Sequence, residues 1–160
     1  MPGSADETAA CRPLLFSIAY GMTGSVGDAE DIVQDAFLGL YRRWDKLRDT
    51  TYPLAYVRAS VLNGCRTAMR RKARESRLPF LTDIPVGSAE SHALLGEEQR
   101  QVARALSLLP SRQREALVLR YYLDLSEEEI AQTMGISRGT VKSATHRGLA
   151  AIGRFVKEAS

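Results

Sequence analysis

The stretch LSEEEIAQTMGISRGTVKSATHRGLAAIGRF, residues 125–155, decides the fold of the C-terminal part of this chain. Ser126 and Glu129 have the spacing of a capping box, in which each side chain binds the backbone N–H of the other residue. A short helix is therefore expected to begin here and to end at Gly135, because a left-handed turn is easiest for glycine. Ser137 is a suitable cap for a second helix. The stretch predicts a helix-turn-helix.

The second predicted helix starts at Arg138 and has an apolar and a polar face. Its inner face is expected to carry Val141, Gly148, Leu149 and Ile152. Its outer face is expected to carry Gly139, Lys142, Ser143, His146 and Arg147. Lysine and arginine reach guanine edges and phosphates, and serine contacts bases or backbone, so this face is predicted to read double-stranded DNA in the major groove. The alternative is a helical hairpin whose basic face is only solvated, which the glycine turn disfavours.

Nearly every long segment repeats its apolar residues at helical spacing, and none alternates like a strand, so the fold is expected to be all-α. Predicted helices span about 13–22, 28–44, 53–77, 97–109 and 111–122. Residues 23–27 are expected to form a turn, and residues 45–52 a polar connection. The apolar stripes are expected to include Leu14, Leu15, Ile18 and Met22, then Ala29, Ile32, Val33, Ala36, Phe37, Leu40, Tyr41 and Trp44, and later Val102, Leu106 and Leu109.

A break in composition divides the chain. Residues 79–96 contain two prolines, two glycines and no basic residue, which is typical of a flexible linker. We therefore expect two small helical domains, 1–78 and 97–160, each with a thin core. The C-terminal domain contains the helix-turn-helix.

The bulk composition limits the class of protein. The 160 residues are 44% hydrophobic and 26% charged, as in a soluble globular protein, and no apolar run approaches a membrane span. No signal peptide is visible at the N-terminus, so the cytoplasm is expected. The charge is uneven, with net +6 over residues 53–78 and −4 over residues 79–99. Basic blocks are typical of proteins that bind nucleic acid, although solvated helix faces would also explain them.

The chain lacks the residue patterns that catalysis and metal binding require. Cys11 and Cys65 with His92 and His146 do not have ligand spacing, so neither a metal nor a cofactor is expected. Cys65 falls on an apolar stripe and is expected to be a buried free thiol. No nucleophile motif, acid–base pair or phosphate-binding glycine loop is present, so we expect no catalytic residues and no enzyme activity.

Three segments together resemble the bacterial RNA polymerase sigma factors, in the extracytoplasmic-function group of the sigma-70 family. LPSRQREALVLRYYLDLSEEEIAQTMGISRGTVKSATHRGLAAI, residues 109–152, is similar to sigma region 4. DAEDIVQDAFLGLYRRW (28–44) is similar to region 2.2, and PLAYVRASVLNGCRTAMRRKARE (53–75) to regions 2.3 and 2.4. The order of the three segments is what makes the resemblance specific, since other regulators share the region 4 pattern.

The resemblance implies a mechanism. Such a chain binds core RNA polymerase and directs it to promoters, with the first domain recognising and opening the minus-ten element and the second reading the minus-thirty-five element. Its partners are core polymerase, double-stranded promoter DNA and the melted non-template strand. The resemblance suggests an anti-sigma protein as a further partner. No membrane is involved. The acidic linker would thread the polymerase near the RNA exit path.

The resemblance also implies residue roles. The predicted minus-thirty-five contacts are Arg138, Thr140, Lys142, Ser143, His146 and Arg147. The predicted minus-ten and melting contacts are Tyr56, Asn63, Arg66, Arg70 and Arg71. The predicted polymerase-binding surface is Asp31, Gln34, Asp35 and Leu38, unless this is an ordinary solvated acidic face. The loop 47–51 matches the family's loop that holds a flipped base.

Two departures from the family bear on the promoter sequence. Lys142 replaces a common arginine, which weakens a bidentate guanine contact. Ala144 replaces a common basic residue, which is expected to remove a phosphate contact. The promoter sequence therefore cannot be copied from relatives. The other function considered is that of a free-standing helix-turn-helix regulator that acts without core polymerase.

Overall fold

A computed structural model describes residues 5–50, 53–75 and 96–159, and within them every regular element is an α-helix. The expected all-α fold is confirmed. The chain divides into two compact units, Met1–Leu94 and Leu95–Ser160. Residues 79–95 of the predicted linker lie outside the described residues.

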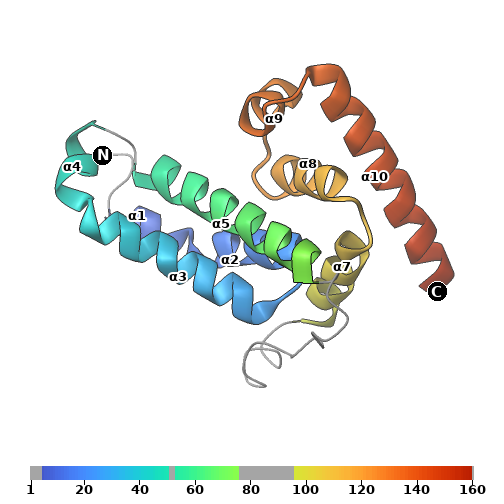
Figure 1. Cartoon of the computed structure of the whole chain (residues 1–160), viewed down its shortest axis with the longest axis horizontal. Coiled ribbons are helices and arrows are strands. Elements are labelled where there is room, and N and C mark those ends of the chain that lie inside the picture. Colours follow the sequence, from blue (N-terminus) through green and yellow to red (C-terminus); the bar gives the residue numbers. More distant parts are fainter. Residues whose placement is uncertain (1–4, 51–52, 76–95, 160) are drawn as a thin grey trace. The chain divides into compact units, whose positions relative to one another are not determined.

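The first unit is built around three helices that pack against one another (Figure 1). Its elements are α1 (Ala5–Ala10), α2 (Arg12–Thr23), α3 (Val26–Arg42), α4 (Trp44–Thr50) and α5 (Pro53–Glu75). Helices α3 and α5 run antiparallel. Only Gly24 and Ser25 separate α2 from α3: Gly24 takes the left-handed conformation at φ 69°, and the Ser25 side chain accepts a hydrogen bond from the Asp28 N–H.

The core of the first unit comes from one face of each of these three helices. Its deeply buried members include Leu15, Ile18, Met22, Val26, Leu40, Val57, Val61 and Cys65. Cys65 is buried and free, as expected. Helix α5 lies close to α3, since a Cβ atom at Gly64 would stand 2.9 Å from Cγ2 of Ile32.

Ion pairs join the end of α5 to the start of α3. Nζ of Lys72 lies 3.7 Å from the Asp28 carboxylate and donates a 2.6 Å hydrogen bond to the Thr23 carbonyl. Arg71 lies 3.5 Å from the same carboxylate. Asp28 lies in the first turn of α3 and the two bases in the last turns of α5, where each charge complements its helix dipole.

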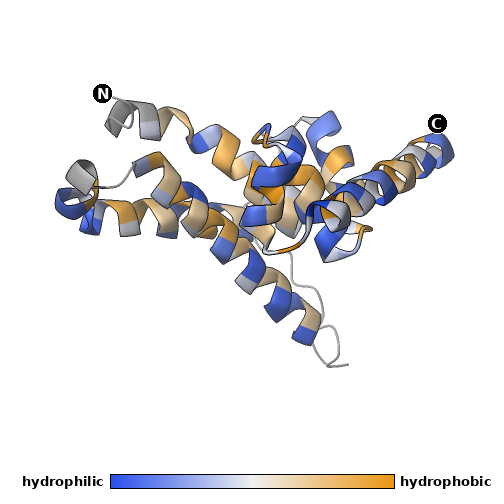
Figure 2. Ribbon diagram, turned by 90° about the horizontal axis from the view of Figure 1, so that it is seen from above, coloured by the Kyte–Doolittle hydropathy of each residue, from blue (hydrophilic) through white to orange (hydrophobic). Residues whose placement is uncertain are grey.

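The second unit consists of α7 (Glu97–Ser107), α8 (Ser111–Tyr121), α9 (Glu127–Met134) and α10 (Arg138–Ala159). Helix α10 packs on the other three. The buried apolar residues are Ala103, Leu106, Leu109, Ala116, Leu117, Val118, Leu119, Ile130, Ala131, Val141 and Ala144. The alternation of apolar and polar stripes along the helices is visible in Figure 2.

Arg114 closes the C-terminal end of α7. Its guanidinium donates hydrogen bonds to the carbonyls of Leu106 (2.8 Å), Ser107 (3.1 Å) and Leu109 (2.9 Å). The last carbonyls of a helix have no partner within the helix, so this side chain supplies one. Burial lowers the pKa of the Arg114 guanidinium.

Four residues expected in the apolar stripes lie at the surface instead. They are Leu14, Tyr41 (63% exposed), Val102 and Leu149 (45% exposed). Each stands next to a buried residue in the sequence, namely Leu15, Leu40, Ala103 and Gly148. One residue turns a helix by about 100°, and that step carries the side chain off the buried face.

The expected polar connection after residue 44 is also wrong in part. Residues Trp44–Thr50 form α4, and the carbonyl of Arg43 accepts the N–H groups of Lys46 and Leu47. Trp44, expected at the end of the preceding helix, begins α4 and is half-buried. Apolar residues within the polar stretch, such as Leu47, were too few to reveal a second helix.

The contact between α10 and α8 gives a stability prediction. A Cβ atom at Gly148 would stand 2.8 Å from Cδ1 of Leu117, which is itself buried. Gly148→Ala is expected to lower the free energy of unfolding by about 1–3 kcal/mol, because the core must shift to accept the methyl group. Gly153→Ala in the same helix meets no atom within 4 Å and should raise it by about 0.5–1 kcal/mol. Urea denaturation of the full chain measures both, and equal changes would contradict the close packing.

Candidate nucleic-acid interface

The capping box that opens α9 is present with both of its hydrogen bonds. The Glu129 N–H donates to Oγ of Ser126 at 3.1 Å, and the Ser126 N–H donates to Oε1 of Glu129 at 3.1 Å. Before it, Asp124 has a φ of 54°, a left-handed conformation in the turn from α8. The start of α9 is therefore fixed by local chemistry, as the sequence predicted.

The turn between α9 and α10 follows the predicted pattern. Gly135 has a φ of 68°, and its N–H and that of Ile136 both donate to the Ala131 carbonyl. The Ser137 hydroxyl then accepts the Thr140 N–H at 3.1 Å and lies 2.8 Å from the Thr140 hydroxyl. These bonds fix the direction in which α10 leaves the turn. The helix-turn-helix is confirmed.

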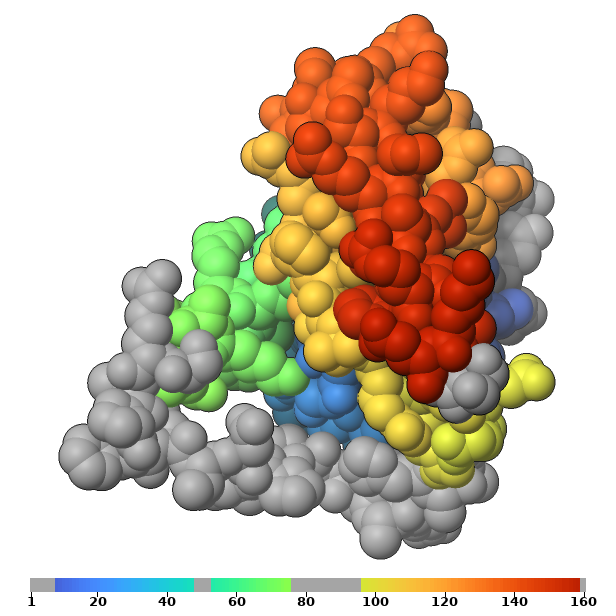
Figure 3. All heavy atoms as spheres, turned by 90° about the vertical axis from the view of Figure 1, so that its right-hand side faces the viewer, coloured from blue at the N-terminus to red at the C-terminus, as the bar shows by residue number. Residues whose placement is uncertain are grey.

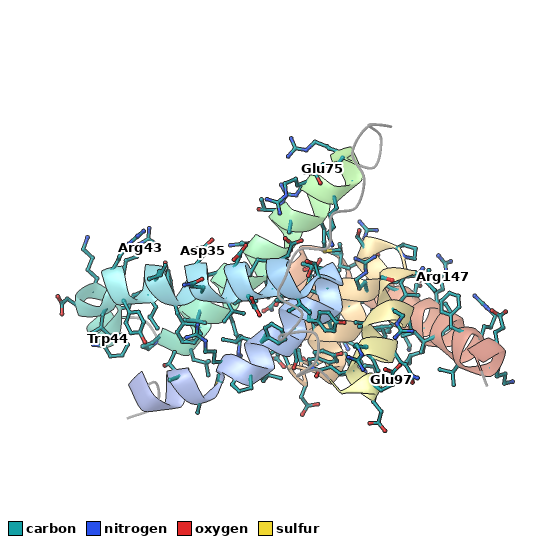
Figure 4. All side chains as sticks on the ribbon, turned by 90° about the horizontal axis from the view of Figure 1, so that it is seen from below. Asp35, Arg43, Trp44, Glu75, Glu97 and Arg147 are labelled. Carbon is teal, nitrogen blue, oxygen red and sulfur yellow. The ribbon has the colours of Figure 1, made fainter. Side chains whose placement is uncertain are left out.

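The polar face of α10 points away from the core. Arg138, Lys142, Ser143, His146 and Arg147 are all exposed, whereas Val141, Thr145 and Gly148 of the same helix are buried. Figure 3 shows α10 as a continuous strip on the surface of its unit, and Figure 4 marks Arg147 on it. Thr140 is half-buried, and its hydroxyl belongs to the helix cap. The structure thus brings together the predicted DNA-reading side chains.

The expectation that Ala144 removes a phosphate contact is wrong. Its side chain is only 6% exposed, on the inner face of α10 beside Val141. The neighbouring Thr145 is also buried, and its hydroxyl bonds to the carbonyls of Val141 and Lys142. A basic side chain at position 144 would point into the core, so alanine there does not remove a phosphate contact.

A second polar surface lies along α5. Asn63 and Arg70 are exposed and Arg66 is half-buried, and Nη1 of Arg66 lies 3.5 Å from Oδ1 of Asn63. Figure 2 shows that the C-terminal half of α5 is largely hydrophilic. The structure places these three predicted residues on one face of the helix. Arg71 lies apart from them, in ion pairs with Asp28 and Glu75.

Tyr56 has a partner that sequence reasoning missed. Its hydroxyl accepts a 2.9 Å hydrogen bond from Nη1 of Arg43, and the Arg43 guanidinium carbon lies 5.6 Å from the centroid of the ring. Figure 4 shows Arg43 at the end of α3, next to Trp44. Arg43 is the C-terminal cap residue of α3 and Tyr56 lies in α5, thirteen positions farther along the chain, so no spacing rule connects them.

The predicted polymerase-binding residues share the solvent-facing side of α3. Asp31, Gln34, Asp35 and Leu38 are all exposed. Asp35 is labelled in Figure 4. In the predicted base-holding loop, residues 47–50 are helical rather than a loop, and Thr51 lies outside the described residues.

Neither a metal cluster nor a membrane helix is found in the described part of the chain. Over residues 5–50, 53–75 and 96–159, no three His, Cys, Asp or Glu side chains are placed to hold a metal ion. Across the same ranges, no helix has both the length and the apolar character needed to cross a bilayer.

Comparison with known proteins identifies both units. The family model for Sigma-70 region 2 matches residues 9–75, and the model for Sigma-70, region 4 matches residues 99–152. The RNA polymerase sigma-E factor of Streptomyces avermitilis is 38% identical over 125 residues, which cover 77% of this chain and 68% of that protein. The ECF RNA polymerase sigma factor SigL of Mycobacterium tuberculosis H37Rv is 30% identical over 156 residues, which cover 96% and 86%.

Solved structures share the fold. The sigma factor RpoE from Bartonella quintana, solved in complex with the anti-sigma factor NepR, superposes with a TM-score of 0.71 at 24% identity over 95% of each chain. CnrH, solved with the cytosolic domain of CnrY, gives a TM-score of 0.66 at 23% identity over 97% of this chain and 88% of CnrH.

A helix-turn-helix unit with an exposed basic face, joined in sequence to a unit with a second basic helix, defines a promoter-recognition protein. The chain belongs to the extracytoplasmic-function group of the sigma-70 family of bacterial RNA polymerase sigma factors. A sigma factor binds core RNA polymerase and directs promoter-specific initiation of transcription. The region 2 match favours this function over that of a free-standing regulator, which has no need of that region.

Proposed function

We propose that the second unit reads the minus-thirty-five element through the outer face of α10. Lys142, Ser143 and Arg147 supply the base and phosphate contacts, and Arg138, Thr140 and His146 complete the surface. One observation carries this proposal: all of these side chains except half-buried Thr140 are exposed, and they project from a helix that α8 and α9 hold in place. From Arg138 to Arg147 the helix contains no acidic residue, so this part of the face is attractive to phosphates.

The first unit binds the minus-ten element and core polymerase with two different helices. Asn63, Arg66 and Arg70 on α5, with Tyr56 nearer its start, contact the promoter where it opens, because amide and aromatic groups suit an unstacked base. Arg71 contributes less, since two carboxylates already pair with it. Asp31, Gln34, Asp35 and Leu38 on α3 bind core polymerase, and this exposed acidic and apolar surface suits a basic helical partner.

The chain works in the cytoplasm, where the polymerase is, and catalyses no reaction itself. The two domains, 1–78 and 97–160, act on the two promoter elements, and the linker 79–96 passes through the polymerase. The sigma factor RpoE was solved in complex with the anti-sigma factor NepR, and CnrH with the cytosolic domain of CnrY. An anti-sigma protein is the corresponding partner of this chain.

Run-off transcription with core polymerase on a promoter library tests the function, and Arg147→Ala tests the reading helix. The variant should lower promoter-dependent transcription about tenfold, because a good side-chain contact to a base is worth about 1–3 kcal/mol. Binding to core polymerase should not change. Arg154→Ala, which removes the same charge from the same helix about 10 Å farther along, is the matched control. Loss of core binding in the Arg147 variant, or promoter binding by the wild type that is equally tight without core enzyme, would contradict the proposal.

Reversing the charges of Asp31 and Asp35 tests the polymerase surface. Replacing both with lysine is expected to abolish binding to core polymerase in a pull-down or fluorescence titration, because attraction becomes repulsion. Replacing exposed Glu98 and Glu158 of the second unit with lysine gives the same change in net charge and should leave binding nearly intact. If the two double variants bind equally well, the α3 surface does not contact the polymerase.

A further inference from the structure

Arg43 and Tyr56 form a pair at the place where α3 ends and α5 begins. We propose that they are one binding element for single-stranded DNA, in which the Tyr56 ring stacks on an unstacked base while the Arg43 guanidinium positions the ring and binds a neighbouring phosphate. This inference rests on the proposed role of α5 in opening the minus-ten element. It adds Arg43, the C-terminal cap residue of α3, as a positioning residue from outside α5.

The first support is that the Tyr56 hydroxyl lies in a space left by a glycine. A Cβ atom at Gly39 of α3 would stand 2.9 Å from Oη of Tyr56, and the ring carbons Cε1 and Cζ would be 3.8 Å away. Any larger residue at position 39 would therefore push the hydroxyl out. Together with the 2.9 Å hydrogen bond from Arg43, this space fixes the ring at its outer end. A ring held in one orientation loses less entropy when a base stacks on it.

The second support is the charge of Arg43. Its side chain is exposed, and its hydrogen-bond partner is a neutral phenol. Among the residues that the structure describes, no carboxylate forms an ion pair with it, whereas Arg71 has two such partners. A guanidinium beside an aromatic ring offers a planar charged donor for a phosphate next to a surface for a base. Aromatic stacking combined with basic groups is the usual way in which proteins hold single strands.

The pair also lies in register with the rest of the α5 surface. Tyr56 and Asn63 are seven residues apart, which is about two helical turns, so both belong to the same face of α5. A strand that follows this face from Asn63 reaches the ring next, with Arg43 beside it. The melted strand is single only after opening, so the pair stabilises the open promoter and not the duplex.

The test measures promoter opening by the full chain with core polymerase, through permanganate reactivity of unpaired thymines. Arg43→Gln is expected to lower opening about tenfold, within the range of alanine effects at base-stacking sites. The matched control is Arg42→Gln, which removes the same charge from the neighbouring exposed position. Arg43→Lys keeps the charge but loses the planar fork, so it should restore only part of the activity. Equal losses at positions 42 and 43 would overturn the inference.

A double-mutant cycle separates the effect of the Tyr56 ring position on promoter opening from the effect of the Arg43 charge. Gly39→Ala should lower opening severalfold in the presence of Tyr56, because the new methyl group displaces the hydroxyl. Combined with Tyr56→Phe, the same change should have little further effect, since the ring carbons lie at ordinary contact distance. An equal effect of Gly39→Ala in both backgrounds would contradict a role for this space.

Two further readouts distinguish failure of this inference from failure of the proposed function. Core binding and minus-thirty-five duplex binding are measured for each variant, and both should stay at the wild-type level. If wild-type chain and core polymerase give no promoter-specific transcript, the proposed function itself fails. If the wild type opens promoters and Arg43→Gln matches Arg42→Gln, only the role of Arg43 fails.

Discussion

The close packing of α10 on α8 at Gly148 is the constraint on which the proposed DNA-reading surface depends. With no side chain at this position, the α10 backbone approaches Leu117, and Ala144 and Val141 are buried about one turn and two turns earlier, respectively. Burial of this face turns Lys142, Ser143, His146 and Arg147 outward. The two local caps, at Ser126 and Ser137, fix where α9 and α10 begin. Core packing thus sets the direction of the polar face, and the caps set its starting point.

The first unit uses a similar constraint to separate two surfaces. Helices α3 and α5 lie close together at Gly39 and Gly64, and the ion pairs of Asp28 join their opposite ends. The acidic face of α3 and the basic face of α5 therefore belong to one helical bundle, in which we propose that the first binds core polymerase and the second binds the promoter. A sigma factor has to bind polymerase and promoter at once, and this arrangement allows both contacts.

Local chemistry was predictable from the sequence, and contacts between helices were not. The capping box of Ser126 and Glu129 and the left-handed turn at Gly135 depend on neighbours in the chain, so their spacing was sufficient. Periodicity found the long helices but missed α4, and it misplaced residues at the border of each stripe, such as Tyr41 and Leu149, because a stripe has no sharp edge. The burial of Ala144 and the partnership of Arg43 with Tyr56 depend on packing between helices. No periodicity within one helix contains that information.

The central claim is that the outer face of α10 lies against promoter DNA. A photo-crosslinking amino acid placed at Ser143 of the full chain, assembled with core polymerase on a promoter, tests it most directly. The account predicts crosslinks to the duplex about 35 base pairs upstream of the start site, and none from the same group at exposed Gln101 on α7. Absence of DNA crosslinks from position 143, or equal crosslinks from both positions, would contradict it.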